Sequence, residues 1–416
     1  KDLRPLALQN TCVKWISTTI MLQVMDALQQ IIPPEQKGFL PGRQMVDHLV
    51  FARAEWDRLP EQAMVAIDFQ KAYDSVSFAL MECTLLFLGL GVEYVRLLLS
   101  VMSAPILFCV GRSFEPTVVL HPRSGIRQGD PLSPLLFDVI TVLLIYDIKS
   151  LKIELVLLLY ADDILFCVLG RGSKQDKDLR AALYRLGIFG YFSGLKVNAS
   201  KTYAVVKVRE GEASPSTLAG VVVKPHVKYL GSLLGNVSEE KAYAPAIAKM
   251  MARARAMAAL PLGLMEKSFL FASWVAPVCY LTARAYRPTE HVCSQLDLVH
   301  RTALGLTNWN LTMPILLLPP SEGGLGQASL SAYAQWAHSH AFVTYVLRPG
   351  RFAEQHSGPF RRWAAAQGLL MEEEFLPYLQ LGPVPLSRPS FLQGCLKAYS
   401  VTRRWGGGVP PPPEHR

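Results

Sequence analysis

Three aspartates stand where the sequence changes from apolar to polar, and their setting suggests metal-dependent chemistry. Asp68 ends the apolar run 63–67, and Asp162 and Asp163 lie between two apolar runs of strand length. Two carboxylates about 4 Å apart repel each other and lose hydration against the strands, so a cation is needed to compensate them. An Asp-Asp turn alone is common in exposed loops. With Asp68 as a third ligand, the strand setting favours a two-metal site for phosphoryl transfer.

The elements that must position these aspartates alternate between strands and helices. Residues 155–159 and 164–168 predict two strands around a tight hairpin. The other predicted strands are 63–68, 203–208 and 221–233, with a hairpin and loop over 112–129, and the predicted helices are 10–32, 45–57, 77–90, 132–148 and 177–193. This order indicates an α+β fold.

After Gly235 the pattern is helical only. Apolar residues recur at intervals of three and four along one helix face, with Lys249 and Arg253 beside them; they are Tyr243, Ile247, Met250, Ala254 and Met257. Residues 241–310 contain eight Lys and Arg against three Asp and Glu, a local charge of +5. A solvated helix face explains such charges equally well. A polyanionic partner is the alternative.

Composition excludes several classes of protein. The chain has 416 residues, half of them hydrophobic and 18% charged, which excludes a peptide hormone and a disordered chain. Seven scattered cysteines form no Cys-x-x-Cys pair, which argues against a disulfide framework, a disulfide-linked partner or a zinc site and favours an intracellular protein of the cytoplasm or nucleus. The apolar runs 97–111 and 268–283 come closest to the length of a membrane span, but each is too short and contains a proline. The chain begins without methionine, so we expect a fragment.

Seven blocks in order resemble reverse transcriptases, in particular those of non-LTR (LINE-type) retrotransposons. They are Arg4-Pro5-Leu6-Ala7-Leu8 with Lys14, and the segments 36–43 (QKGFLPGR), 68–76 (DFQKAYDSV), 125–134 (GIRQGDPLSP), 160–163 (YADD), 194–202 (GLKVNASKT) and 229–231 (YLG). The resemblance implies a right-hand polymerase fold of fingers, palm and thumb, with an antiparallel palm sheet and an all-helical C-terminal region.

The resemblance also implies a role for individual residues. Asp68, Asp162 and Asp163 match the catalytic carboxylates that hold two Mg²⁺ ions, with Mn²⁺ as an alternative. The residues that match nucleotide-binding positions are Arg4, Phe69, Tyr73, Gln128 and Lys201. Tyr73 falls where an aromatic ring would exclude a ribose 2′-hydroxyl, although a packed core tyrosine is the alternative. Lys201 could protonate pyrophosphate or be a solvated turn residue, and Asp74 is best interpreted as a helix-start acid.

The remaining matches concern nucleic acid. Lys37 and Arg43 could contact the template backbone or lie at the surface, Tyr229 and Gly231 resemble the block that grips the primer end, and Lys249 and Arg253 would hold the duplex. We expect fingers in 1–60, palm in 61–235, thumb in 236–310, a helical connection in 311–400 and a disordered tail in 401–416.

The predicted function is an RNA-directed DNA polymerase that extends a DNA primer with dNTPs on an RNA template. Two rivals stay open: a decayed or domesticated copy that only binds RNA, and a palm-type nucleotidyl cyclase, which needs neither a basic thumb nor the Gln128 loop. The segment between the helix at 132 and Tyr160 departs from the family pattern, because it lacks the usual glycine turn. The sequence also has no zinc knuckle after the thumb and no segment large enough for an endonuclease.

Overall fold

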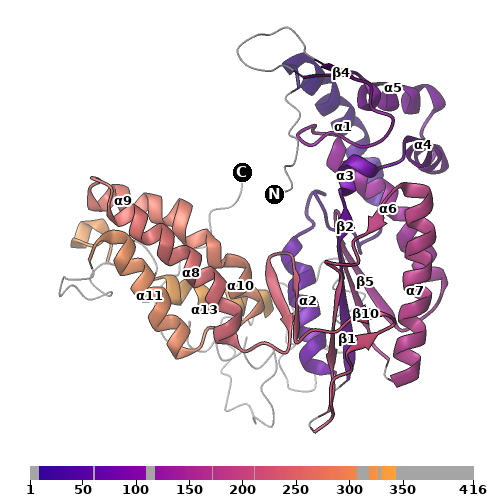
Figure 1. Ribbon diagram of the computed structural model, residues 1–416. Coiled ribbons are helices and arrows are strands. Elements are labelled where there is room, and N and C mark those ends of the chain that lie inside the picture. The colour runs from indigo at the N-terminus through magenta and orange to yellow at the C-terminus, as the bar shows by residue number, and fades with distance from the viewer. Residues whose placement is uncertain are drawn as a thin grey trace, which may run out of the picture. The chain divides into compact units, whose positions relative to one another are not determined.

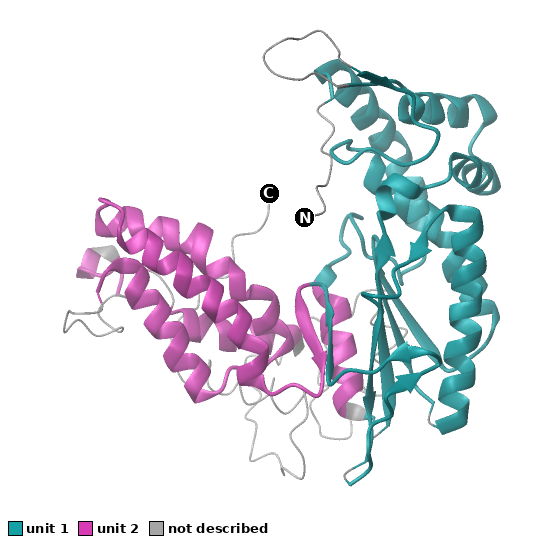
Figure 2. Ribbon diagram, in the orientation of Figure 1, with its two compact units in different colours: residues 1–45, 59–230 teal, residues 46–58, 231–416 magenta. Residues whose placement is uncertain are grey.

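The computed structural model describes residues 9–59, 61–108, 118–170, 172–209, 211–306, 318–326 and 329–342. The chain divides into two compact units, coloured separately in Figure 2. Unit 1 comprises residues 1–45 and 59–230, and unit 2 comprises residues 46–58 and 231–416. The predictions for Arg4 and for the tail 401–416 lie outside the described residues, as does most of the predicted region 311–400.

Unit 1 contains the strands that carry the three aspartates. Its helices are α1 (Thr11–Ile31), α3 (Ala72–Ser75), α4 (Phe78–Phe87), α5 (Val92–Ser103), α6 (Ser133–Ser150) and α7 (Gly172–Ser193). Its strands are β1 (Gln62–Ile67), β2 (Phe69–Gln70), β3 (Ile106–Phe108), β4 (Val118–Leu120), β5 (Leu155–Tyr160), β6 (Asp163–Val168), β7 (Lys196–Val197), β8 (Tyr203–Lys207), β9 (Thr217–Leu218), β10 (Val221–Val222) and β11 (His226–Tyr229).

The core of unit 1 is a four-stranded sheet in the order β5-β6-β1-β8, and all three of its strand pairs are antiparallel. The strands predicted at 63–68, 155–159, 164–168 and 203–208 are therefore confirmed. Helix α7 packs against α6 and β6, and both helices run beside the sheet in Figure 1. Smaller pairs join β2 to β7, β3 to β4 and β9 to β10.

Local sequence explains where the helices of unit 1 begin and end. The Asn10 side chain accepts the Cys12 N–H at the start of α1, and this helix ends just before Pro33. Ser77 caps α4 by accepting the Leu80 N–H. After α6, Lys152 takes a left-handed conformation (φ 50°) in the connection to β5. A lysine thus makes the turn for which the family pattern has glycine, and β5 still pairs with β6 along its whole length.

One predicted strand is wrong as a single element. The apolar run 221–233 is divided into β10, β11 and the first residues of β12 (Ser232–Gly235), a strand of unit 2. Leu230 and Gly231 have positive φ angles of 47° and 81°, which strand geometry does not permit. Helix α5 was not predicted either, because its second half was interpreted only as part of the apolar run 97–111.

Unit 2 is helical apart from β12 in its described part. It contains α2 (Met45–Arg58), α8 (Glu239–Ala258), α9 (Leu264–Leu270), a π-helical turn (Phe271–Val275), a 3₁₀ turn (Ala276–Cys279), α10 (Tyr280–Ala285), α11 (Glu290–Leu304), a second 3₁₀ turn (Pro320–Glu322) and α13 (Leu330–Phe342). Although α2 lies early in the sequence, all but its first residue belong to this unit. The guanidinium of Arg53 on α2 lies over the Tyr286 ring, 4.8 Å from its centroid.

The predicted apolar face of α8 is confirmed. Tyr243, Met250, Ala254 and Met257 are buried in the core of unit 2, and Ile247 packs at its edge. The Tyr243 hydroxyl donates to the Tyr286 carbonyl oxygen at 2.9 Å, which ties α8 to the residue after α10. Among the described residues, none of the helices combines the length and the hydrophobicity that a membrane span requires.

Candidate active site

The strand register brings the three aspartates to one end of the sheet. Ile67, the last residue of β1, lies opposite Ile164 of β6, so the next residue, Asp68, follows the register toward Asp163. Tyr160 pairs with Asp163 across the hairpin, which leaves Ala161 and Asp162 as the two turn residues. The predicted tight hairpin is confirmed, and the sheet places residues almost a hundred positions apart in sequence at the same edge.

Asp68 is held in place by the loop that follows β7. Its carbonyl oxygen accepts the Asn198 N–H at 2.7 Å, and its Oδ2 accepts Asn198 Nδ2 at 3.1 Å. Its own N–H donates to Thr202 Oγ1 at 3.4 Å. Asn198 thus orients both the backbone and the carboxylate of Asp68. Sequence reasoning included Asn198 in a family block but gave it no role.

The two aspartates of the turn have different surroundings. Asp162 is half-buried and Asp163 is exposed. Burial raises the pKa of Tyr73, and the charge of Asp162 raises it further, so this phenol lies within electrostatic reach of the turn and stays protonated. Burial likewise raises the pKa of Tyr229, and Asp163 adds to that effect. The turn therefore interacts electrostatically with Tyr73, a residue predicted to bind the nucleotide, and with Tyr229, a residue predicted to bind the primer.

The donor chemistry of this edge fits a hard divalent cation, because the candidate ligands are carboxylate oxygens from strand ends. Among the described residues, however, no group of three or more His, Cys, Asp or Glu side chains is gathered closely enough to hold a metal ion. One oxygen of Asp68 is also engaged by the Asn198 amide. The fold brings the right donors to one edge without closing them into a ligand cluster.

Tyr73 lies on the short helix α3, and the Gln128 loop is attached to that helix. The Tyr73 ring stacks on Phe137 of α6, with centroids 5.1 Å apart and planes 8° apart. The Ile126 N–H donates to the Tyr73 carbonyl oxygen at 2.7 Å, and a Cβ on Gly125 would lie 2.7 Å from the Asp74 carbonyl oxygen. Gln128 itself is half-buried in the loop before α6. The backbone of the loop that carries Gln128 is thus hydrogen-bonded to the helix that carries Tyr73.

The other nucleotide-binding candidates differ in exposure. Phe69 is buried on β2, opposite Val197 of β7. Lys201 is exposed in the loop after β7, and its N–H donates to the Asn198 carbonyl oxygen at 3.0 Å. Both therefore belong to the same region as Asp68, and their roles in nucleotide binding stay predictions.

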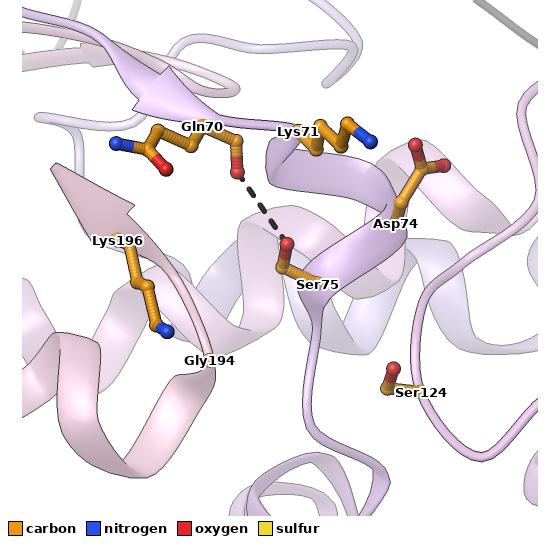
Figure 3. A pocket seen from close by; sticks show the side chains of 7 residues that line it. All are labelled: Gln70, Lys71, Asp74, Ser75, Ser124, Gly194 and Lys196. Carbon is orange, nitrogen blue, oxygen red and sulfur yellow. Dashed lines mark hydrogen bonds between the residues drawn. The ribbon is translucent and has the colours of Figure 1, made fainter. Parts of the chain in front are cut away.

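A polar pocket of about 400 Å³ lies beside α3 (Figure 3). It is lined by Gln70, Lys71, Asp74, Ser75, Ser124, Gly194 and Lys196. Ser75 Oγ donates to the Gln70 carbonyl oxygen at 3.4 Å, the hydrogen bond drawn in Figure 3. Asp74 is exposed in the first turn of α3, which agrees with its interpretation as a helix-start acid. The pocket contains neither the three aspartates nor Tyr73.

The structure gives Arg43 and Lys37 contacts within the protein. Arg43 donates to the carbonyl oxygens of Gln29, Ile32, Pro33 and Gln36, at 2.6 to 2.8 Å. These bonds occupy both terminal nitrogens of the guanidinium and fasten the connector to the end of α1. The Lys37 side chain is buried, with 4% of its surface exposed. Contacts of either residue with a template stay predictions.

The residues predicted to bind primer and duplex lie at the end of unit 1 and in unit 2. Tyr229 is buried at the end of β11, and Gly231 has a left-handed backbone (φ 81°). Lys249 is exposed on α8. Arg253, one turn later, donates to the Trp274 carbonyl oxygen and lies 5.4 Å from the centroid of the Trp274 ring.

Sequence reasoning missed a buried carboxyl group under the site. Asp138 of α6 is fully buried, and neither of its carboxyl oxygens has a hydrogen-bond partner in the structure. Burial raises the pKa of Asp138 well above its ordinary value, although the charge of Arg43 acts in the opposite direction. Burial therefore favours the protonated form of this carboxyl group. An acid inside the apolar run 135–145 was the signal that could have identified it.

Comparison with known proteins assigns the family. The family model described as "Reverse transcriptase (RNA-dependent DNA polymerase)" matches residues 1–234, more than half of the chain. The chain belongs to the reverse transcriptase family. This confirms the predicted fold class, an α+β right-hand polymerase fold with an antiparallel palm sheet.

Similar proteins come from mobile elements. The transposon TX1 uncharacterized 149 kDa protein of Xenopus laevis is 28% identical over 227 residues, which is 50% of this chain and 16% of that protein. The Pol polyprotein of the type-2 element R2DM of Drosophila melanogaster is 25% identical over 49% of this chain and 20% of its own length. The Pol polyprotein of the type-1 element R2 of Popillia japonica is 23% identical, and the alignment covers 76% of this chain and 50% of that protein. These relatives confirm the resemblance to the non-LTR kind, and the alignments span half or less of each of them.

Solved structures show more distant likenesses. The RNA-dependent RNA polymerase of a human picorbirnavirus is 14% identical with a TM-score of 0.42, over 81% of this chain and 60% of that chain. Telomerase from Candida tropicalis in complex with a fragment of telomeric RNA is 12% identical with a TM-score of 0.41, over 82% of this chain and 56% of that chain. Neither adds to the family assignment.

Proposed function

We propose that this chain is an RNA-directed DNA polymerase that extends a DNA primer on an RNA template during retrotransposition. The observation that carries the proposal is the strand register, which sets Asp68 beside the Asp162-Asp163 turn at one end of an antiparallel sheet. Membership of the reverse transcriptase family supports the reaction class. The primer 3′-hydroxyl would attack the α-phosphate of a dNTP and release pyrophosphate.

The three aspartates would hold two Mg²⁺ ions, or Mn²⁺ in their place. Such ions lower the pKa of the attacking hydroxyl and neutralise the triphosphate when bound. Asn198 would keep the Asp68 carboxylate oriented through its 3.1 Å hydrogen bond. The hairpin fixes Asp162 and Asp163 relative to each other, which limits the motion needed to bring the carboxylates around a cation.

The surrounding residues would bind the substrates. Tyr73 would exclude a ribose 2′-hydroxyl, because its ring is fixed by stacking on Phe137 and has little freedom to move aside. Gln128 and Phe69 would line the nucleotide site, Arg4 would hold the triphosphate, and Lys201 would protonate the leaving pyrophosphate. Tyr229 and Gly231 would position the primer end, and Lys249 with Arg253 would contact duplex phosphates.

Asp162→Asn tests the proposal. This change removes a charge at nearly constant volume, so primer extension on poly(rA)/oligo(dT) with Mg²⁺ and dTTP should fall by at least about a thousandfold, while binding of template-primer persists. Asp26→Asn, at an exposed position on α1, makes the same change of charge and serves as the matched control. Near-normal extension by Asp162→Asn would show the assignment to be wrong. A wild-type protein that binds RNA but extends no primer would instead support a decayed, RNA-binding copy.

A further inference from the structure

We infer that Gln36 is a positioning residue that holds the catalytic turn in place, an inference that rests on the proposed function. Gln36 belongs to the connector between α1 and α2, and its side chain is completely buried. The connector backbone pairs with β5 just before the turn. The Lys37 N–H donates to the Leu159 carbonyl oxygen at 2.8 Å, and the Leu159 N–H donates to the Glu35 carbonyl oxygen at 2.9 Å.

The Gln36 amide bonds directly to the turn. Its Oε1 accepts the Ala161 N–H at 2.9 Å and the Gly38 N–H at 2.9 Å. Its Nε2 donates to Thr141 Oγ1 of α6 at 3.0 Å and makes a longer contact of 3.5 Å with the Ala161 carbonyl oxygen. Thr141 Oγ1 in turn donates to the Asp138 carbonyl oxygen at 2.7 Å. One side chain thus connects the turn, the connector and a long buried helix.

The turn residue needs this support. Ala161 has a left-handed backbone (φ 52°), which is unfavourable for an alanine because its Cβ approaches the following carbonyl oxygen. Such a conformation persists only where the surroundings hold it. Ala161 is buried, so its N–H would have no water to bond if Gln36 were absent. The residue immediately after it is Asp162, so a relaxed Ala161 would redirect a catalytic carboxylate.

The connector packs closely against the turn at Gly38. A Cβ added to Gly38 would lie 2.6 Å from the Ala161 nitrogen, 3.0 Å from Asp138 Oδ1 and 3.1 Å from Gln36 Oε1. The connector therefore touches the turn so closely that only glycine fits at this point. Because Gln36 meets no solvent, its hydrogen bonds have no competitor in water, and the geometry of the turn follows the geometry of the amide.

Gln36→Met is the direct test, because it keeps the length of the side chain and removes every hydrogen bond to the turn. Gln29→Met is the matched control: Gln29 is half-buried near the end of α1, and its amide donates to the Pro41 carbonyl oxygen of the connector at 2.9 Å. We expect Gln36→Met to lower kcat for primer extension about a hundredfold, as a misplacement of about 1 Å does, while the Kd for template-primer changes by less than about threefold. Hydrogen exchange of a peptide covering residues 160–163 should accelerate. Gln29→Met should change none of these.

Several results would overturn the inference. A kcat within about threefold of wild type would do so, and so would a loss explained entirely by a smaller active fraction in burst kinetics. If Gln36→Met does not fold, Thr141→Val removes only the support behind the amide, and an unchanged kcat for that folded variant would be contrary evidence. If the wild-type chain extends no primer, the proposed function fails on its own, and the exchange experiment still decides whether Gln36 holds the turn.

Discussion

Gly194, at the end of α7, should not tolerate even a methyl group. It has a left-handed backbone (φ 80°), and a Cβ built on it would overlap the Ser75 carbonyl oxygen on α3. Figure 3 shows Gly194 at the edge of the polar pocket, with Ser75 nearby. Next to this contact, the Ser77 N–H donates to the Ser193 carbonyl oxygen at 2.8 Å. Gly194→Ala would therefore push the end of α7 away from the helix that carries Tyr73.

The size of the effect follows from two contributions. A left-handed alanine costs about 1 to 2 kcal/mol, and forcing an extra methyl against a fixed backbone costs about 1 to 3 kcal/mol more. Gly194→Ala should therefore lower the free energy of unfolding of unit 1 by about 2 to 5 kcal/mol. Gly187, in the exposed middle of α7 with no atom within contact distance of an added Cβ, is the control. Gly187→Ala should stabilise the unit by about 0.5 to 1 kcal/mol.

Urea denaturation read by hydrogen exchange in peptides from β1 and β6 would report on unit 1 separately from unit 2. For a slope of about 2 kcal/mol per molar, the Gly194→Ala midpoint should fall by more than about 1 M, and that of Gly187→Ala should rise slightly. A Gly194→Ala midpoint equal to that of wild type would refute the argument from close approach. An equal fall in both variants would attribute the loss to α7 in general rather than to the contact with Ser75.

Three further predictions follow from single side chains. Tyr73→Ala should admit rNTPs at least about tenfold better relative to dNTPs, measured as the ratio of kcat/KM values, and an unchanged ratio would contradict the role of the ring. Lys249→Ala and Arg253→Ala should each lower the slope of log K for duplex against log salt by about 0.9. Arg253→Ala should also lower the stability of unit 2, because it loses the contacts with Trp274. Burial lowers the pKa of His338 from 6.5 to about 3. Between these two pKa values the unfolded chain binds a proton that the folded chain does not. The free energy of unfolding of unit 2 should therefore fall by about 1.4 kcal/mol per pH unit as the pH falls from about 6 to 4. The slope should be smaller in His338→Gln, as measured by urea unfolding at each pH.

The sequence by itself determined the local architecture of the candidate site. The apolar runs on either side of Tyr160-Ala161-Asp162-Asp163 predicted β5, β6 and the tight turn between them, and the run before Asp68 predicted β1. The apolar spacing of α8 also predicted the face that is buried. These features could be predicted because strand alternation, helix periodicity and turn residues act within a few positions along the chain.

Only the tertiary structure decided which distant residues support the turn. Gln36 lies 125 positions from Ala161, and no periodicity links an amide in a connector to the backbone of a hairpin. In the same way, Arg43 was predicted either to contact the template backbone or to lie at the surface, and no sequence pattern indicated that its guanidinium bonds to four carbonyl oxygens around the end of α1. Hydrogen bonds and burial at such separations depend on how the elements pack in three dimensions, so the sequence pattern identified the aspartates and the fold selected the residues that hold them.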